Sequence, residues 1–174
     1  MSIINSIETF HTLQQDADHV DIKTIEGAVT LREFIAGTLT YYPAWIKALY
    51  VIRAGFVRLL GMTQENMTIQ KLTPETTPFE TGDMATFFQV YDAQENHYWV
   101  ASASDKHLDA YLGVMQEPLD NGLSRFHVVT IVHYNNWAGP IYFNIIRPFH
   151  HVVVRSMMQA GIRYQRKPSA KQYA

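Results

Sequence analysis

The feature that most constrains the fold is a long amphipathic pattern near the C-terminal end, between residues 134 and 161. Pro148 has no N–H to donate to the carbonyl of Asn144, so we expect a kink in the helix there. Gly161 is expected to end the helix. Residues at helical spacing form one broad, mainly apolar face: Tyr142, Ile145, Ile146, Phe149, Val152, Val153, Ser156, Met157 and Ala160. So wide an apolar face needs a partner layer, and a sheet can supply it.

The partner layer is predicted by a run of short strands with turn residues between them. These strands are expected at residues 84–91, 97–103, 107–115 and 125–134. Because each follows the previous one through a turn or loop, they predict an antiparallel meander. The last strand is apolar on both faces, which predicts a central strand that is covered on both sides or lines a cavity.

The first half of the chain adds one strand and two helices. Residues 20–25 alternate apolar and polar side chains, which predicts a strand. Thr30 and Glu33 form a capping-box pattern at the start of a short helix. Pro43 separates that helix from a second, amphipathic one, which Gly61 is expected to end. The chain therefore reads as strand, two helices, several strands and one long helix.

A single domain is expected over residues 1–174, with a core from about residue 20 to residue 161 and a flexible tail at 162–174. Apolar residues make up 47% of the chain and aromatic residues 13%, which is enough for a sizeable core. Two segments are less clearly patterned. Residues 1–18 are interpreted as a short arm or helix, and residues 67–72 as a further strand.

Charge and cysteine content exclude several classes of function. The net charge of −2 argues against a protein that binds nucleic acid through a basic surface. The absence of cysteine excludes disulfides, thiolate catalysis and cysteine-bound metals. The N-terminal segment lacks the pattern of a secretory signal, and no apolar stretch is long enough to span a membrane. We therefore expect a cytoplasmic protein.

Several short motifs, taken together over about residues 20–160, resemble an uncharacterised bacterial family, a domain of unknown function, within the START-like (SRPBCC) helix-grip superfamily. They are Trp45…Leu49…Arg53…Gly61, the run Ser104–Asp109, Thr130-x-Val132-His133-x-Asn135, and Tyr142…Ile146-x-Pro148-Phe149-His150. The resemblance implies an α+β fold: a curved antiparallel sheet wrapped around a long C-terminal helix, with two shorter helices after the first strand. It also implies a cavity between sheet and helix that often holds a lipid, a sterol or an aromatic metabolite. It brings no established functional residues.

Aromatic and large apolar side chains are spread through the elements expected to surround such a cavity. Small-ligand sites are mainly apolar with a few polar groups. The residues expected to bind a small hydrophobic molecule are Trp45, Leu49, Trp99, Tyr111, Tyr142, Ile146 and Phe149. The alternative, that these side chains only pack the core, stays open. We expect no cofactor and no metal.

Three polar residues are catalytic candidates: His107, Asp109 and His133. His107 and Asp109 are two apart on an expected strand and so share a face. If facing residue numbers sum to about 240, as a hairpin centred near residue 120 would give, His107 lies opposite His133. The three could then form an acid/base cluster or hold a divalent metal, or they could simply make cross-strand hydrogen bonds.

Further polar residues lie on the C-terminal helix. His150 and His151 are about 100° apart around a helix, so they cannot both line the cavity. Arg147, His151 and Arg155 share one ridge at i, i+4 spacing, which is read as an anion-binding or partner-binding ridge or as a solvated surface.

Three hypotheses for function follow. The first is a binding protein for a small hydrophobic or aromatic molecule, with Pro148 loosening the helix that covers it. The second is a cyclase-type or hydrolase-type enzyme that uses His107 and Asp109 in the cavity, which requires both side chains to point inward. The third is a homodimer that covers the second apolar face of residues 126–134.

Overall fold

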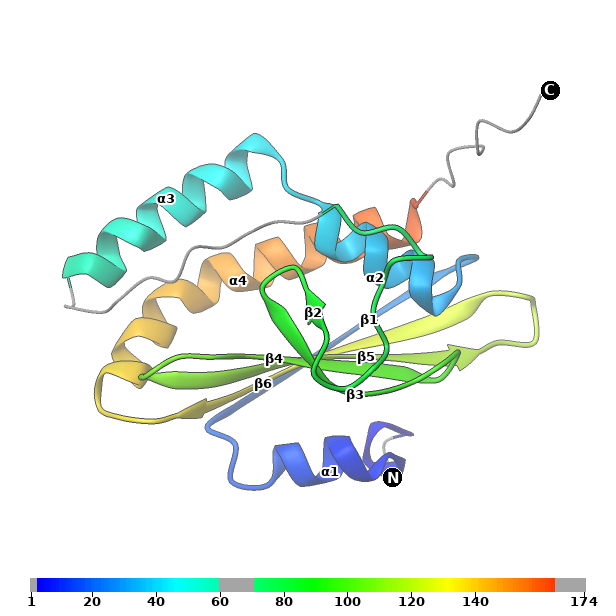
Figure 1. Cartoon of the computed structure of the whole chain (residues 1–174), viewed down its shortest axis with the longest axis horizontal. Helices are drawn as coiled ribbons and strands as arrows, with labels where there is room; N and C mark the ends of the chain where they lie inside the picture. The colour runs from blue at the N-terminus through cyan, green and yellow to red at the C-terminus, as the bar shows by residue number, and fades with distance from the viewer. Residues whose placement is uncertain (1–2, 60–70, 165–174) are drawn as a thin grey trace.

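A six-stranded antiparallel sheet forms the centre of the computed structural model, which describes residues 3–59 and 71–164 (Figure 1). The order of strands across the sheet is β1-β6-β5-β4-β3-β2. The strands are β1 (His19–Gly27), β2 (Met84–Ala85), β3 (Phe88–Gln94), β4 (Tyr98–Ser104), β5 (Leu108–Pro118) and β6 (Ser124–Tyr134). The helical elements are η1 (Ile3–Ser6), α1 (Glu8–Gln14), α2 (Leu31–Thr40), α3 (Ala44–Leu59) and α4 (Ala138–Ile162).

Helices lie on both faces of this sheet. The helices α2, α3 and α4 lie on one face, and α1 lies on the other (Figure 1). The long helix α4 crosses the sheet, and the two shorter helices α2 and α3 follow the first strand. The α+β helix-grip architecture expected from the sequence is therefore confirmed.

The main core lies between the sheet and the pair α2–α4. Phe34 of α2 stacks on Phe126 of β6 with ring centroids 4.2 Å apart. The two helices approach closely at Gly37 and Gly161, since a Cβ built on Gly37 would lie 3.0 Å from the Cα of Gly161. The predicted capping box at the start of α2 is present, with the Glu33 amide donating to the Thr30 hydroxyl at 3.2 Å. This box fixes where α2 begins and so positions its apolar face over the sheet.

The opposite face of the sheet is covered by the chain's own N-terminal segment. Phe10 of α1 lies directly on β5 at Gly113, where an added Cβ would lie 2.1 Å from the Phe10 ring. Val129 and Ile131 of β6 are buried in this second core. The prediction that the last strand is covered on both sides is thus confirmed. The second apolar face of this strand, which the homodimer hypothesis placed against another copy of the chain, is covered by η1 and α1.

Some elements differ from expectation. The single strand expected at 84–91 is two strands, β2 and β3, separated by a turn. Residues 67–70 and 165–174 lie outside the described residues, and Lys71 and Leu72 form no strand. The structure therefore leaves untested most of the strand expected at 67–72 and most of the expected tail.

The apolar face of α4 is also rotated from the expected one. The helix continues through Pro148 without a break. Ile145, Phe149 and Val152 are 46%, 54% and 57% exposed, although we expected them to face the sheet. Phe143 and Met158 are buried instead, and His150 lies against Thr130 of β6. The expected face was wrong by part of a turn because the helix is apolar around more than half of its circumference, so sequence periodicity does not fix which part is covered.

Candidate functional site

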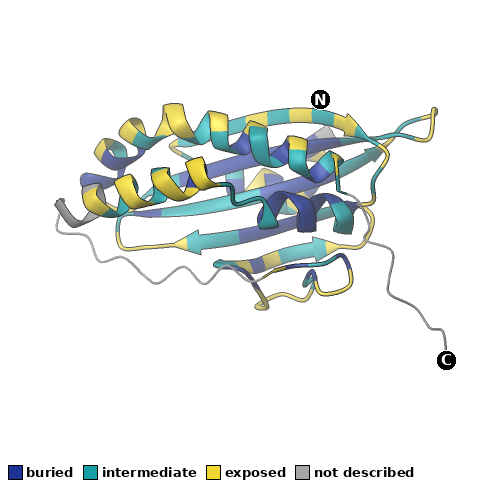
Figure 2. Cartoon of the chain, turned by 90° about the horizontal axis from the view of Figure 1, so that it is seen from above, coloured by how far each residue is buried: buried dark blue, intermediate teal, exposed yellow. Residues whose placement is uncertain are grey.

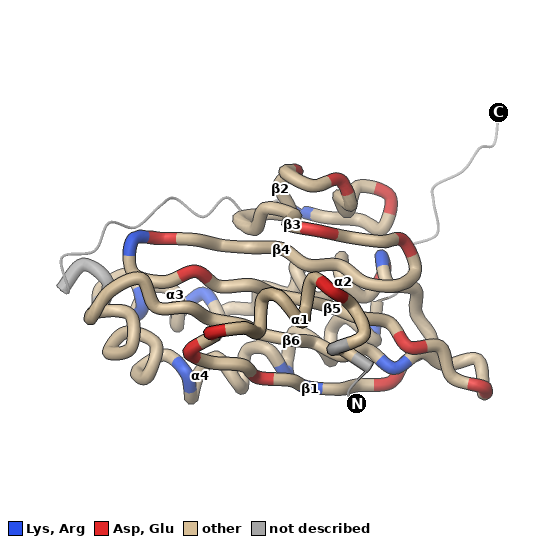
Figure 3. Tube along the Cα trace, turned by 90° about the horizontal axis from the view of Figure 1, so that it is seen from below, with Lys and Arg blue, Asp and Glu red and all other residues tan. Residues whose placement is uncertain are grey.

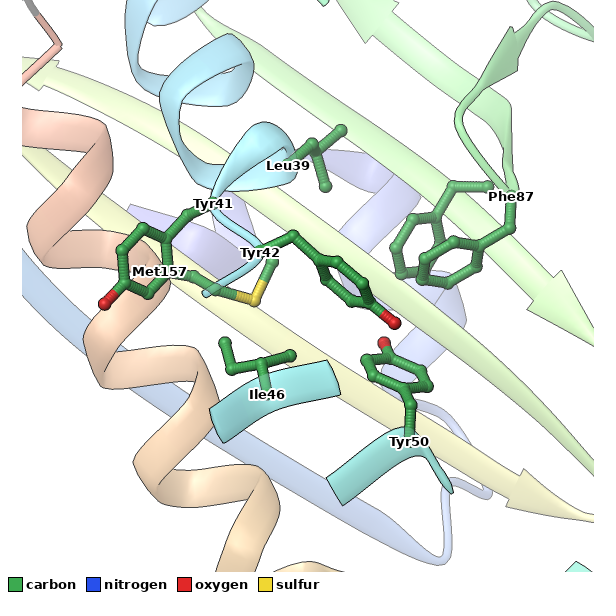
Figure 4. A pocket seen from close by; sticks show the side chains of 8 residues that line it. Leu39, Tyr41, Tyr42, Ile46, Tyr50, Phe87 and Met157 are labelled. Carbon is green, nitrogen blue, oxygen red and sulfur yellow. The ribbon is translucent and has the colours of Figure 1, made fainter. Parts of the chain in front are cut away.

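A small aromatic pocket lies beside α4, under α3. Its walls come from the end of α2, from α3, from the turn between β2 and β3, and from α4 (Figure 4). The lining residues are Leu39, Tyr41, Tyr42, Ile46, Tyr50, Phe87, Phe88 and Met157. The space left between these side chains is ≈ 20 Å³, which is room for about one water molecule. Pockets for organic ligands measure about 300 Å³ or more, so a ligand would have to displace part of the wall.

The local sequence explains two walls of the pocket. Helix α2 ends before Pro43, which leaves Tyr41 and Tyr42 in the connection to α3. Ile46 and Tyr50 lie one turn apart on α3 and therefore face the same way. The rings of Tyr42 and Tyr50 have centroids 5.4 Å apart. Burial raises the pKa of both phenols, so both are neutral at physiological pH.

The third wall rests on a strained turn. Thr86 is buried and has a φ of 61°, a conformation that is unfavourable for a β-branched residue. The turn directs Phe87 toward Tyr42 and Tyr50 in Figure 4. Phe87 and Phe88 pack against one another with centroids 4.4 Å apart. Strained backbone of this kind is retained where surrounding structure requires it, which makes this wall a candidate for function.

A polar contact ties α3 to α4 next to this pocket. The guanidinium of Arg53 donates a hydrogen bond to the Tyr142 hydroxyl, and its Cζ lies 5.5 Å from the centroid of that ring. Burial raises the pKa of Tyr142, which outweighs the opposing effect of Arg53. Arg53 is thus a cation held close to an aromatic, neutral surface, where it can serve as the polar contact of a bound molecule.

The seven ligand-binding residues expected from the sequence do not lie around this pocket. Trp99 is fully buried in the main core, where its indole N–H donates to the carbonyl of Pro78 at 2.9 Å. Tyr111 packs on Tyr91 and His133 on the face covered by α1, away from α4. Trp45 and Phe149 are 39% and 54% exposed.

The remaining three expected ligand-binding residues, Leu49, Tyr142 and Ile146, lie on α3 and α4, and Tyr142 is the contact of Arg53. The pocket uses residues next to the expected ones: Ile46 follows Trp45, and Tyr50 follows Leu49. One residue turns a helix face by about 100°, and the sequence alone could not set that rotation for α3.

The catalytic candidates do not converge. The register pairs Asp109 with His133, so the expected pairing of His107 with His133 was wrong by two residues. A slip of two keeps the face, and this face is the one under α1 rather than under α4. His133 contacts the carbonyl of Leu13 through Nε2 at 3.0 Å, and His107 Nδ1 lies 3.1 Å from Asn136 Oδ1. The inward orientation that the enzyme hypothesis requires is not met by Asp109.

A second group of polar side chains does converge, where β1 meets α4. We call it the β1–α4 seam, and it comprises His19, Asp21 and Lys23 of β1 with His150 and His151 of α4. The ammonium of Lys23 forms an ion pair with Asp21 and lies 2.9 Å from His151 Nδ1. His151 Nδ1 is 3.6 Å from the Asp21 carboxylate. Figure 3 shows acidic and basic positions along β1 beside α4.

Burial controls the charges in the seam. Burial, together with the charge of Lys23, lowers the pKa of His150 to about 4, so this imidazole is neutral at physiological pH. Burial also lowers the pKa of His19. For Asp21 burial acts upward, but the hydrogen bond from Lys23 outweighs it and holds the pKa of the carboxyl below its usual value. The seam therefore combines one ion pair with the neutral imidazoles of His19 and His150.

Groups of three metal-binding side chains, the minimum for a convincing cation site, are absent among the residues that the structure describes. None of the helices built from those residues is long and apolar enough to cross a membrane. Neither the pocket nor the seam is thus assigned to a metal.

Comparisons with known proteins give a family and several structural likenesses. The family model described as a protein of unknown function (DUF2867) matches residues 13–157. No curated protein matches the chain. A hypothetical protein from Helicobacter pylori is 11% identical, with 86% of this chain and 89% of that chain covered and a TM-score of 0.46.

Two further solved structures are similar to this chain. Norcoclaurine synthase from Thalictrum flavum is 11% identical, with 87% of this chain and 89% of that chain covered and a TM-score of 0.45. A START superfamily protein from Mycobacterium smegmatis is 13% identical, with coverage of 81% and 98% and a TM-score of 0.38.

Proposed function

Because the chain belongs to the DUF2867 family, whose function is unknown, its activity must be argued from its own residues, and we propose that it binds a small aromatic or apolar molecule in the pocket under α3. The observation that carries this proposal is the composition of the pocket wall. Five of its residues are aromatic: Tyr41, Tyr42, Tyr50, Phe87 and Phe88. Aromatic walls bind flat apolar molecules by stacking and by removing their surface from water.

The α3 helix is the part of the wall that would move to admit a ligand. It presents Val51 and Ile52 to solvent at 72% and 68% exposure. Over residues 44–55, the part of α3 whose burial the structure describes, Ile46 is the one buried side chain. Helices held by little buried surface open at low free-energy cost. A bound molecule would replace water against Tyr50 and Phe87 and keep the hydroxyl groups of Tyr42 and Tyr50 as polar contacts.

The test uses the neutral fluorescent probe N-phenyl-1-naphthylamine, which becomes bright in apolar sites. We expect saturable binding to the wild-type chain. Tyr50→Leu should weaken it about tenfold, because a stacking ring is lost from the wall. Val51→Leu is the matched control on the exposed side of the same helix and should leave the affinity unchanged.

One outcome would contradict the proposed pocket. Equal affinity of the Tyr50→Leu and Val51→Leu proteins, at equal stability in urea, would show that the probe binds elsewhere. Hydrogen exchange gives a second readout: the amides of α3 should exchange more slowly when the probe is bound, because the open state is then depleted.

A further inference from the structure

On the edge strand β1, polar side chains face α4 and apolar side chains face solvent, which is the reverse of the usual pattern. Exposed and less exposed residues alternate along β1 (Figure 2). Val20 and Ile22 are 37% and 44% exposed. Between them, His19 packs on Phe143 of α4, and Asp21 and Lys23 contact His151 of α4. Taking an ion pair and imidazoles out of water costs free energy that Val and Ile at those positions would not cost. Sites where a sequence departs from the pattern that favours folding are often functional sites.

The seam retains hydrogen-bonding capacity that its own residues do not use. The Nε2 atom of His19 is buried and has no hydrogen-bond partner among the described residues. Among the described residues, His150 has one weak hydrogen bond, between its Nε2 and the Thr130 hydroxyl at 3.4 Å. An ammonium has three N–H donors, and Lys23 directs two of them, to Asp21 and His151. The seam therefore has hydrogen-bond donors that its own residues do not use.

Charge selects the kind of ligand that fits. Lys23 and Arg147 bring two positive charges to this region, and Asp21 brings one negative charge. The imidazoles of His19 and His150 are neutral, and a neutral imidazole can donate one hydrogen bond. An additional anion would balance the excess positive charge and accept from Lys23 and His19. An additional cation would be repelled by both charges.

The neighbouring side chains are aromatic, which favours an organic anion over an inorganic one. The ring of His19 lies 4.8 Å from that of Phe143, and the ring of Tyr134 lies 6.1 Å from that of Phe143. We infer that the β1–α4 seam is a binding site for the oxyanion of a small aromatic compound, a carboxylate or a phenolate. This site lies at β1, apart from the pocket under α3, and does not depend on the function proposed for that pocket.

The probe for this inference is 4-nitrophenol, whose anion is yellow and whose neutral form is not. A site that prefers the anion about tenfold lowers the apparent pKa of the bound phenol by about one unit. We expect the wild-type protein to bind the probe saturably and to shift its absorbance–pH curve to lower pH. Failure to observe a saturable shift would overturn the inference.

Variants assign the shift to the seam. Lys23→Met should abolish it, because the principal cation is removed. Asp21→Asn should enlarge it, because the competing carboxylate is removed. Lys106→Met is the matched control at an exposed turn and should behave as wild type. A shift that survives Lys23→Met would overturn the inference, and the double variant Asp21→Asn/Lys23→Met provides the same test without leaving a single charge unpaired.

Competition identifies the chemical class. Benzoate should displace 4-nitrophenolate, since both present an oxyanion on an aromatic ring. Displacement by inorganic phosphate at similar concentrations would reveal a general anion site and overturn the organic assignment. Binding of N-phenyl-1-naphthylamine should be the same in the Lys23→Met and wild-type proteins, so a failure of the seam and a failure of the pocket are distinguishable.

Discussion

The two sides of α4 differ sharply in chemistry. On the side of α3, Met157 faces an aromatic pocket that contains almost no unfilled space. On the side of β1, His150 and His151 face an ion pair. One helix thus has an apolar contact that contributes to folding and a polar contact that costs free energy unless its groups are paired.

The contrast shows how stability and ligand chemistry are divided in this protein. The apolar side could bind a molecule only by moving α3, since ≈ 20 Å³ does not hold one. On the side of β1, Lys23 and the histidines of the seam already lie in position, and a bound anion would balance the excess positive charge. If the two sides differ in this way, changes in the seam should alter stability and its pH dependence more than changes in the pocket wall do.

We expect the largest change in folding stability at acid pH. His150 is buried with a pKa of about 4, against 6.5 for the unfolded chain, and it faces Lys23, Asp21 and His19 of β1, Thr130 of β6 and His151 of α4. Because the folded pKa is the lower one, its contribution is present above pH 6.5 and is lost as the pH falls toward 4. We expect this one residue to cost about 3 kcal/mol of stability at about pH 4.

Urea unfolding at neutral and acid pH measures this effect. The difference in unfolding free energy between the two conditions should be smaller by about that amount in His150→Gln. His11→Gln, at an exposed position of α1, should keep the full acid dependence of the wild type. If both variants behave alike, His150 is not buried in neutral form and the seam is wetter than described.

The second prediction concerns the ion pair of the seam. The side chains of Lys23 and Asp21 are only 13% and 19% exposed. A double-mutant cycle with Lys23→Met and Asp21→Asn should give a favourable coupling of about 1 kcal/mol. Arg125 and Glu26, whose side chains are 38% and 45% exposed, provide the comparison and should couple more weakly. Equal coupling in the two cycles would contradict the burial of the seam.

The smallest effect concerns the strained turn of the pocket. Replacing Thr86 by glycine removes a β-branched side chain from a φ of 61°, so Thr86→Gly should raise the unfolding free energy by about 0.5–1 kcal/mol. It should also weaken binding of the naphthylamine probe, because Phe87 is held less firmly. Asn96→Gly, at a φ of 57°, is the control and should change stability little, since asparagine tolerates this region. A destabilised Thr86→Gly protein would show that the threonine side chain has another role.

Local sequence patterns predicted most of the elements. The capping box of Thr30 and Glu33 fixed the start of α2, because its hydrogen bonds join residues three apart. The short strands β5 and β6 and the loop that joins them predicted an antiparallel pair, and the two apolar faces of β6 predicted its central place. These features depend on neighbours in sequence and on the periods of helix and strand.

Rotation and register were decided only by the tertiary structure. The faces of α3 and α4 are apolar over a wide arc, so their periodicity left open whether Trp45 or Ile46, and Phe149 or His150, would turn inward. Likewise, the turn between β5 and β6 could shift the pairing by two residues without changing any face. The weak pattern of residues 1–18 did not reveal that α1 would pack on Gly113.

The β1–α4 seam shows most clearly what the sequence alone does not determine. Lys23 and His151 lie 128 residues apart, and nothing in either local pattern connects them. The alternation of β1 predicted a strand but left open which of its two faces would be turned toward α4. Period and capping are short-range properties that the sequence determines by itself. The meeting of β1 with α4 follows from how all the layers pack at once, because the burial of the whole core, and not of these polar residues, selects that arrangement.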